Sequence, residues 1–390
     1  MKTESFGTTA GGVKATLYTL ENKNHTVVKV TDLGATLVSV LYADKEGKLC
    51  DMVLGYDDAG AYEKGTSYFG ATIGRNGNRI KGARATIGGK EWVIEANEGE
   101  NSLHSGSNGF HHLMWEMKES GDNFVSFYHY SPQEEQGFPG NMHITVTYTL
   151  DDEDTIHIAY DAKADADTVM NFTNHSYFNL AGHDSGVMED QKLQIMADAY
   201  TPVVDSRAIP TGEIVPVAGT PMDFTTMKPI GQDIREDFDQ LKYTGGYDHN
   251  YVLSDKPGTM RQMAKAECVA SGIAMDAYTD CCGVQFYAGN FIGTQTGKGG
   301  VTYGDRHGFC LESQFYPNAV NEKNFPSPVV SGTAPPYFIK LRCHLRGCDR
   351  RCNHRAVVVR LIQSFLIDKV CAASVWKKMQ MWALWERNNV

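Results

Sequence analysis

The sequence lacks the features that would tie a protein to a membrane. No run of about 18 apolar residues, the length that a transmembrane helix needs, occurs in its 390 residues. The opening residues MKTESFGTTAGG also lack the apolar stretch of a secretion signal. We therefore expect a soluble protein with no membrane partner.

Basic residues are also scarce. The 36 Lys and Arg are outnumbered by 47 Asp and Glu, which gives a formal net charge of −11. Such a charge disfavours nucleic acid and anionic lipid as partners. The nine cysteines follow no regular spacing, and Cys281 and Cys282 are adjacent. This cysteine usage favours free thiols in the reducing cytoplasm.

The apolar residues, 42% of the chain, are spaced as in β-strands. Residues 143–150 (HITVTYTL) and 155–162 (TIHIAYDA) both alternate with a period of two, and together they predict a hairpin. Residues 85–94 (ATIGGKEWVI) predict a second hairpin, because Gly88 and Gly89 tolerate the positive φ angles of a tight turn. Further strands are expected in residues 25–43 and 123–131. The pattern predicts an all-β fold, an antiparallel sandwich or barrel.

The composition changes near residue 335. Residues 331–390 hold eleven Lys or Arg against three Asp or Glu, with four of the nine cysteines and three of the five tryptophans. We therefore predict a β domain over 1–335 and an atypical basic tail over 336–390, disordered or folded as a peripheral helix. The tail also contains a candidate zinc cluster whose spacing matches no standard finger: Cys343, His344, Cys348, Cys352 and His354.

Five segments concentrate polar residues in the predicted domain. Residues 173–180 (TNHSYFNL) hold two amides, an imidazole, a hydroxyl and a phenol. The other segments are 74–82 (GRNGNRIKG), 101–116 (NSLHSGSNGFHHLMWE), 245–253 (GGYDHNYVL) and 311–321 (LESQFYPNAVN). Taken singly, each is explained by turn capping, backbone hydrogen bonds or surface ion pairs. The first of these four is a poor phosphate loop, since no Lys-Ser/Thr pair follows it.

Taken in chain order, these segments resemble the aldose 1-epimerases. The resemblance covers roughly residues 5–330 and also includes IPTGEIVPVAGTPMDF, GVQFYAGNF and NEKNFPSPVV. It implies a large antiparallel β-sandwich, the supersandwich of that family. The sequence departs from the family pattern at Ser105, where a glycine is usual, and in the tail, which lacks the family's final strand ending in an aromatic residue.

The resemblance also implies roles for individual side chains. It makes His175 the general acid, Glu312 the general base, and His104 a second imidazole near the ring oxygen of the sugar. The expected ligands of sugar hydroxyls are Asn78, Arg79, Asp248 and Gln285. Tyr177 follows His175 by two residues and is expected to line the same pocket.

The chemistry of anomer interconversion fits this set of residues. One group must take the proton of the C1 hydroxyl while another gives a proton to the ring oxygen, and neither step needs a metal or a redox cofactor. We expect Glu312 to keep His175 charged, because a nearby opposite charge raises the pKa of an imidazole. The expected partner is a free aldose such as glucose or galactose, and the expected assembly is a monomer or homodimer.

Three alternatives stay open at this stage. The first is an epimerase of hexose 6-phosphates, which would need several basic groups around the phosphate. The second is a sugar-binding module without catalysis. The third is a metal-dependent hydrolase that uses His104, His111, His112 and His175, although the adjacent pair lacks the i, i+4 spacing of helical metal ligands.

Overall fold

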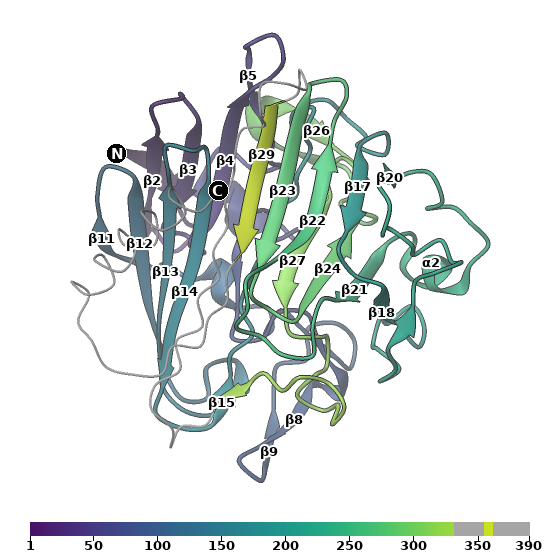
Figure 1. Ribbon diagram of the computed structural model, residues 1–390. Helices are drawn as coiled ribbons and strands as arrows, with labels where there is room; N and C mark the ends of the chain where they lie inside the picture. The colour runs from purple at the N-terminus through teal and green to yellow at the C-terminus, as the bar shows by residue number, and fades with distance from the viewer. Residues whose placement is uncertain (331–354, 362–390) are drawn as a thin grey trace, which may run out of the picture.

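The computed structural model describes residues 1–330 and 355–361, the latter as backbone only. Three large β-sheets account for most of the strands (Figure 1). A five-stranded sheet has the order β1 (Lys2–Thr8), β2 (Lys14–Glu21), β3 (Val27–Thr31), β4 (Thr36–Ala43) and β5 (Leu49–Asp51). The second five-stranded sheet has the order β19 (Val215–Pro216), β18 (Ala199–Thr201), β21 (Asp248–Val252), β24 (Gly283–Tyr287) and β27 (Cys310–Gln314).

The largest sheet has nine strands. Its order is β11 (Glu116–Ser120), β12 (Phe124–Ser131), β13 (Met142–Leu150), β14 (Ile156–Ala164), β29 (Arg355–Leu361), β23 (Ile273–Thr279), β22 (Arg261–Glu267), β17 (Lys192–Ile195) and β20 (Lys228–Pro229). Its pairings are antiparallel except for those of β29, which runs parallel to both neighbours.

Short two-stranded ladders, two short α-helices and four 3-10 helices complete the described elements; the 3-10 helices are η1 (Lys81–Ala83), η2 (Phe110–His112), η3 (Glu135–Gly137) and η4 (Lys298–Gly300). The ladders are β6 (Thr72–Ile73) with β16 (Thr173–Asn174), β7 (Arg79–Ile80) with β10 (Ser102–Leu103), β8 (Arg84–Ile87) with β9 (Lys90–Val93), β15 (Thr168–Val169) with β28 (Val329–Val330), and β25 (Gln295–Thr296) with β26 (Thr302–Tyr303). The α-helices are α1 (Ala59–Lys64) and α2 (Asp239–Thr244). No helix in the described ranges is both long and apolar enough to cross a bilayer.

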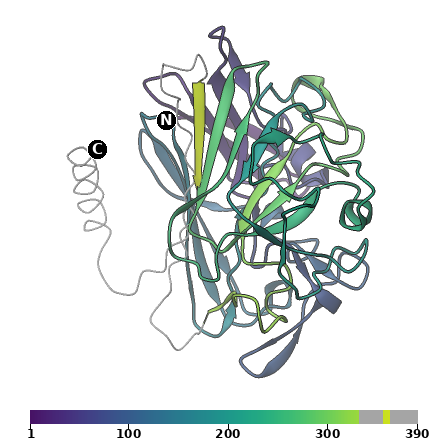
Figure 2. The same cartoon turned by 45° about the vertical axis from the view of Figure 1, so that its right-hand side comes forward.

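The sheets are layered against one another (Figure 2), and all three contribute side chains to the main apolar core, the largest of the apolar clusters among the described residues. Val30 of β3, Val146 of β13 and Phe286 of β24 are all fully buried members of that core. The rings of Tyr18 on β2 and Phe127 on β12 meet edge to face at 5.3 Å, which joins two of the sheets. This arrangement confirms the predicted all-β antiparallel sandwich.

The predicted hairpins are present. Along β13 and β14 nearly every second side chain is buried, and Val146 pairs with Tyr160, so the period-two pattern marks the face toward the core. The β8–β9 hairpin turns at Gly88 and Gly89, whose φ angles of 60° and 77° match the predicted turn.

The prediction for the tail is wrong over the seven residues that the structure describes there. Residues 355–361 form β29, which pairs with β14 on one side and β23 on the other, instead of a disordered segment or a peripheral helix. The segment AVVVRL within it is rich in β-branched valines, which favour a strand, and their helix-compatible spacing was misleading. The predicted boundary at residue 335 and the candidate zinc cluster of residues 343–354 lie outside the described residues.

Candidate active site

His175 is held in place by its own backbone. Its N–H donates to the carbonyl of Ala71 at 3.0 Å, and its carbonyl accepts from the N–H of Gly70 at 3.0 Å, next to the β6–β16 ladder. Gly70 has a φ of 63°, and a Cβ there would lie 1.9 Å from the carbonyl oxygen of Leu37. Only glycine fits this position, so Gly70 allows the close approach that anchors the imidazole.

Glu312 reaches the same point from β27, 137 positions along the chain. Its Oε2 lies 3.6 Å from Nε2 of His175, and the two side chains are only 3% and 5% exposed. That oxygen has no hydrogen-bond partner within the part of the chain that the structure describes. A buried carboxylate oxygen without a donor is costly and so is available to a ligand.

Burial opposes charge on both groups. It lowers the pKa of His175 to about 4, and together with the nearby Asp248 carboxylate it raises the pKa of Glu312 well above its usual range. The expectation that Glu312 keeps His175 charged is therefore wrong for this structure, because desolvation outweighs the attraction between the two groups.

His104 completes a triangle with these two residues. Its ring centre lies 5.1 Å from that of His175, and its Nδ1 accepts a hydrogen bond from the backbone N–H of Asn78 at 3.1 Å. Burial lowers the pKa of His104 well below its usual value, with the nearby His175 and Arg79 as further causes. The neutral ring therefore carries its hydrogen on Nε2, as a donor.

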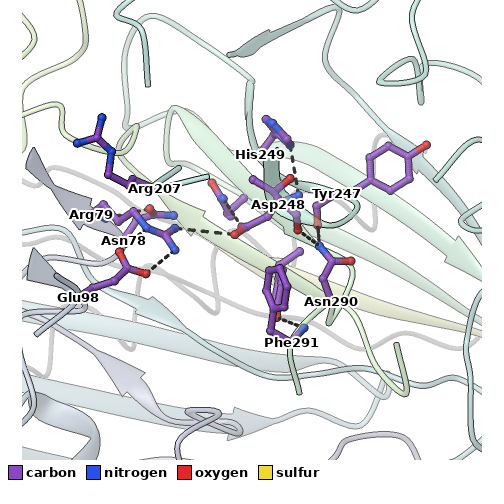
Figure 3. A network of polar contacts seen from close by, with 12 residues as sticks. Asn78, Arg79, Glu98, Arg207, Tyr247, Asp248, His249, Asn290 and Phe291 are labelled. Atoms are coloured by element: carbon purple, nitrogen blue, oxygen red, sulfur yellow. Dashed lines mark hydrogen bonds and ion pairs between the residues drawn. The ribbon is translucent and has the colours of Figure 1, made fainter. Parts of the chain in front are cut away.

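A polar network around Arg79 and Asp248 is shown in Figure 3, and both residues lie close enough to Glu312 to shift its pKa. Arg79 donates to both carboxylate oxygens of Glu98, at 2.7 and 2.8 Å, and its Nη1 lies 3.8 Å from Oδ2 of Asp248. Gln285 donates to Asp248 at 2.6 Å through Nε2. Through its Oε1, Gln285 also accepts from Gln314 at 3.1 Å. The carboxylates and amides so placed suit a ligand with several hydroxyls.

Asn78 joins this network through its side-chain amide. It lies in the left-handed region, with a φ of 62°, and its Nδ2 donates to Oε1 of Gln314 at 3.4 Å. Tyr177 stacks on His175 with ring centres 5.1 Å apart. The structure therefore brings together all eight side chains that the sequence analysis selected.

Four further residues lie among these side chains although their sequence context did not single them out: Tyr68, Glu98, Cys310 and Gln314. The centre of the Tyr68 ring lies 4.8, 4.7 and 5.6 Å from the ring centres of His104, His111 and His175, respectively. No sequence signal marks Tyr68, whereas Cys310 and Gln314 could have been found from the alternation of the strand that carries Glu312.

Ser105 has a backbone conformation that is unfavourable for a residue with a side chain. Its φ is 68°, in the region that favours glycine, so the departure from the family pattern falls where it matters. Its Oγ accepts from the N–H of Asn76 at 2.8 Å and donates to the carbonyl of Asn76 at 3.1 Å. These two bonds offset the strain and brace the loop that carries His104.

The same triangle has the composition of a metal site. The ligand atoms of His104, His175 and Glu312 all lie within 4.8 Å of one another. Two imidazoles and a carboxylate are typical ligands of zinc. This set differs from the four histidines considered above, since it replaces His111 and His112 with Glu312.

Comparison with known proteins identifies the family. Residues 16–332 match the family model for aldose 1-epimerase. The chain belongs to the aldose 1-epimerase family. The galactose mutarotase of Mus musculus is 41% identical over 300 residues, which cover 77% of this chain and 85% of that protein. The aldose 1-epimerase of Escherichia coli K12 is 38% identical over 312 residues, 80% of this chain and 89% of that protein.

Solved structures agree with the sequence relatives. An aldose epimerase homologue from C. elegans has a TM-score of 0.72 at 29% identity, covering 81% of this chain and 94% of that one. The galactose 1-epimerase from Lactobacillus acidophilus has a TM-score of 0.69 at 26% identity, covering 85% and 96%. The resemblance read from the sequence is thus confirmed, as is the supersandwich fold of this aldose 1-epimerase family member.

Proposed function

We propose that the chain interconverts the α and β anomers of free hexoses, glucose and galactose among them, by acid–base catalysed ring opening and closure. The observation that carries this proposal is the buried pair of His175 Nε2 and Glu312 Oε2, 3.6 Å apart. The pair adjoins amide, guanidinium and carboxylate groups suited to sugar hydroxyls. Relatives of the chain include proteins named galactose mutarotase and aldose 1-epimerase, and both names denote this isomerase activity.

In the proposed reaction, one proton passes from His175 to Glu312 through the sugar. Glu312 takes the proton of the C1 hydroxyl, the C1–O1 bond becomes a carbonyl, the bond from C1 to the ring oxygen breaks, and that oxygen takes a proton from His175. Rotation about C1–C2 presents the other face of the aldehyde. Ring closure then returns the proton from Glu312 to His175 by the reverse transfers.

The pKa shifts of the pair fit such a shuttle. With one proton between them, His175 and Glu312 are neutral overall in either arrangement, which suits a buried site. The arrangement with neutral His175 and protonated Glu312 is the one that closes the ring. Donation from the C1 hydroxyl to Glu312 favours its carboxylate form, so sugar binding moves the proton to His175 for ring opening.

The remaining residues serve binding and orientation in this proposal. Arg79, Asp248, Gln285 and Asn78 hold the hydroxyls, and Tyr177 packs against His175. The Nε2–H of His104 donates a hydrogen bond to the ring oxygen of the sugar, where negative charge develops as the ring opens.

Two of the alternatives are not favoured. A 6-phosphate substrate would need several basic groups around the phosphate. Arg79 is the one arginine among the expected sugar ligands, and it is already paired with Glu98 and Asp248. A binding module would not need an acid and a base in contact, yet His175 and Glu312 are both present and adjacent.

Polarimetry tests the proposal directly. Freshly dissolved α-glucose and α-galactose change rotation slowly on their own, and added protein should speed the approach to equilibrium for at least one of them. An unchanged rate with both sugars would reject the proposed function.

A cytoplasmic location is part of this proposal. Cys50, Cys268, Cys281, Cys282 and Cys310 are all free, and all but Cys50 are buried. Free thiols in this number are typical of a reducing compartment.

A further inference from the structure

Glu98 engages most of the guanidinium of Arg79. Its two carboxylate oxygens accept from Nε and Nη2 of that guanidinium, at 2.7 and 2.8 Å, which makes a bidentate pair. The third nitrogen, Nη1, lies 3.8 Å from Oδ2 of Asp248. Figure 3 shows the guanidinium between these two carboxylates. One positively charged group is therefore shared by two acidic side chains.

The turn that carries Glu98 is fixed relative to Arg79. Arg79 on β7 pairs with Leu103 on β10. Just before β10, Glu98 and Asn101 exchange two backbone hydrogen bonds, at 3.1 and 3.0 Å. The side-chain amide of Asn97 bonds to the backbone N–H and carbonyl of Leu103, at 2.8 and 3.0 Å. Because these bonds join the turn to the ladder, the pair of Arg79 and Glu98 is in place before a sugar binds.

We propose that Glu98 is a specificity-determining residue, which keeps sugars that carry a phosphate or a carboxylate out of the site. This inference rests on the proposed function, since it concerns the sugar that is converted. An arginine without a carboxylate partner attracts such anions and binds them through two of its nitrogens. Glu98 occupies two nitrogens of Arg79 and offsets its charge, so that Nη1 is left to donate to an uncharged hydroxyl.

The depth of these charges makes the repulsion effective. The side chains of Arg79, Glu98 and Asp248 are 14%, 35% and 15% exposed, so salt screens them less than it screens charges on the surface. A hexose is smaller than the Debye length of about 8 Å at physiological salt, so an anionic group on any of its carbons lies within range of Glu98. An uncharged sugar meets no such repulsion. Glu98 thus selects by disfavouring the wrong ligand.

Three variants separate the charge of Glu98 from its other contributions. Glu98→Gln keeps the size of the side chain and removes its charge, whereas Glu98→Asp keeps the charge on a shorter side chain. Glu100→Gln is the matched control, because it removes a charge from the same turn. Glu100 is 65% exposed and pairs with Arg207 at 2.7 Å instead of with Arg79.

Polarimetry at low salt gives kcat/KM for glucose, glucuronate and glucose 6-phosphate. Glu98→Gln should raise the ratio of each anionic sugar to glucose about three- to tenfold, because one of the two carboxylates that oppose the anion becomes neutral. Glu98→Asp and Glu100→Gln should change the ratio less than twofold. An unchanged ratio in Glu98→Gln, or an equal rise in Glu98→Asp or Glu100→Gln, overturns the proposal.

The wild type supplies a measurement that does not depend on the folding of a variant. Salt screens the repulsion between charges, so raising NaCl from about 20 to about 500 mM should raise the ratio of glucuronate to glucose at least twofold. A ratio that does not respond to salt overturns the proposal.

Sugar affinity gives a readout that needs no turnover. Calorimetric titration yields dissociation constants for glucose and glucuronate, and Glu98→Gln should lower that of glucuronate about three- to tenfold relative to that of glucose. If this shift appears while the wild type does not speed mutarotation, the proposed function fails and the role of Glu98 stands. If glucose is converted but neither ratio responds to Glu98→Gln, the role of Glu98 alone fails. Binding of neither sugar overturns both.

Discussion

Nε2 of His175 and Oε2 of Glu312 lie 3.6 Å apart, although 137 positions of sequence separate the two residues. The pair is almost completely buried, and desolvation disfavours the charged form of each member. A site of this kind holds one proton most easily, and the proposed reaction requires that one proton to change sides.

Glu312→Gln tests the base. The amide keeps the size of the side chain but cannot take a proton at neutral pH, so kcat should fall by about a hundredfold or more. Polarimetry at saturating sugar measures the change. Glu116→Gln, an exposed change on β11, is the matched control and should behave as wild type. Near-normal mutarotation by Glu312→Gln would remove this residue from the mechanism.

Acid should weaken the fold through its buried histidines, and His249 isolates the effect. Burial lowers the pKa of His249 to about 3, so between its unfolded value of about 6.5 and 3 the unfolded chain binds the extra proton. Stability is therefore lost as the pH falls through this window. Urea unfolding of His249→Gln should show a shallower fall between pH 6.5 and 4 than the wild type. Parallel curves would contradict the assignment.

Chelation separates acid–base catalysis from a metal mechanism. His104, His175 and Glu312 could together bind a divalent cation, but the proposed transfers need only the proton of the pair. Mutarotation should therefore survive prolonged dialysis against EDTA. Loss of activity that added zinc restores would instead favour the metal-dependent alternative.

Ser105 allows the strain at a positive φ to be measured. Ser105→Ala keeps the φ of 68° but loses both hydrogen bonds to Asn76, so the free energy of unfolding should fall by about 1–3 kcal/mol. Ser105→Gly loses the same bonds but relieves about 1 kcal/mol of strain, and should be the more stable of the two variants. Guanidinium titrations give both values. An alanine variant at least as stable as the glycine variant would show that the φ is not a constraint.

A proline at position 358 tests the place of β29. Val358 pairs with Asp276 of β23 inside the nine-stranded sheet, where proline cannot supply the backbone N–H of the ladder. Val358→Pro should lower the free energy of unfolding by about 1 kcal/mol or more, and Val358→Thr should change it little. If both variants match the wild type in urea, the segment is peripheral, as its composition first suggested.

The strands whose signals are local could be predicted from the order of the amino acids alone. The β13–β14 hairpin follows from strict alternation, and the β8–β9 turn follows from two glycines that tolerate positive φ. The eight site residues could also be selected from the sequence, because polar motifs in the order typical of a family identify that family without a structure.

How those residues behave depends on the packing around them in three dimensions. The sign of the pKa shift of His175 depends on how much water the fold excludes, and no motif encodes that amount. Tyr68 and Cys310 join the site because the loop before β6 and the strand β27, both distant in sequence from His175, bring them to its ring. Likewise, residues 355–361 are helix-compatible in spacing, yet they form β29 between β14 and β23, since a non-local sheet pairing outweighs a local periodicity.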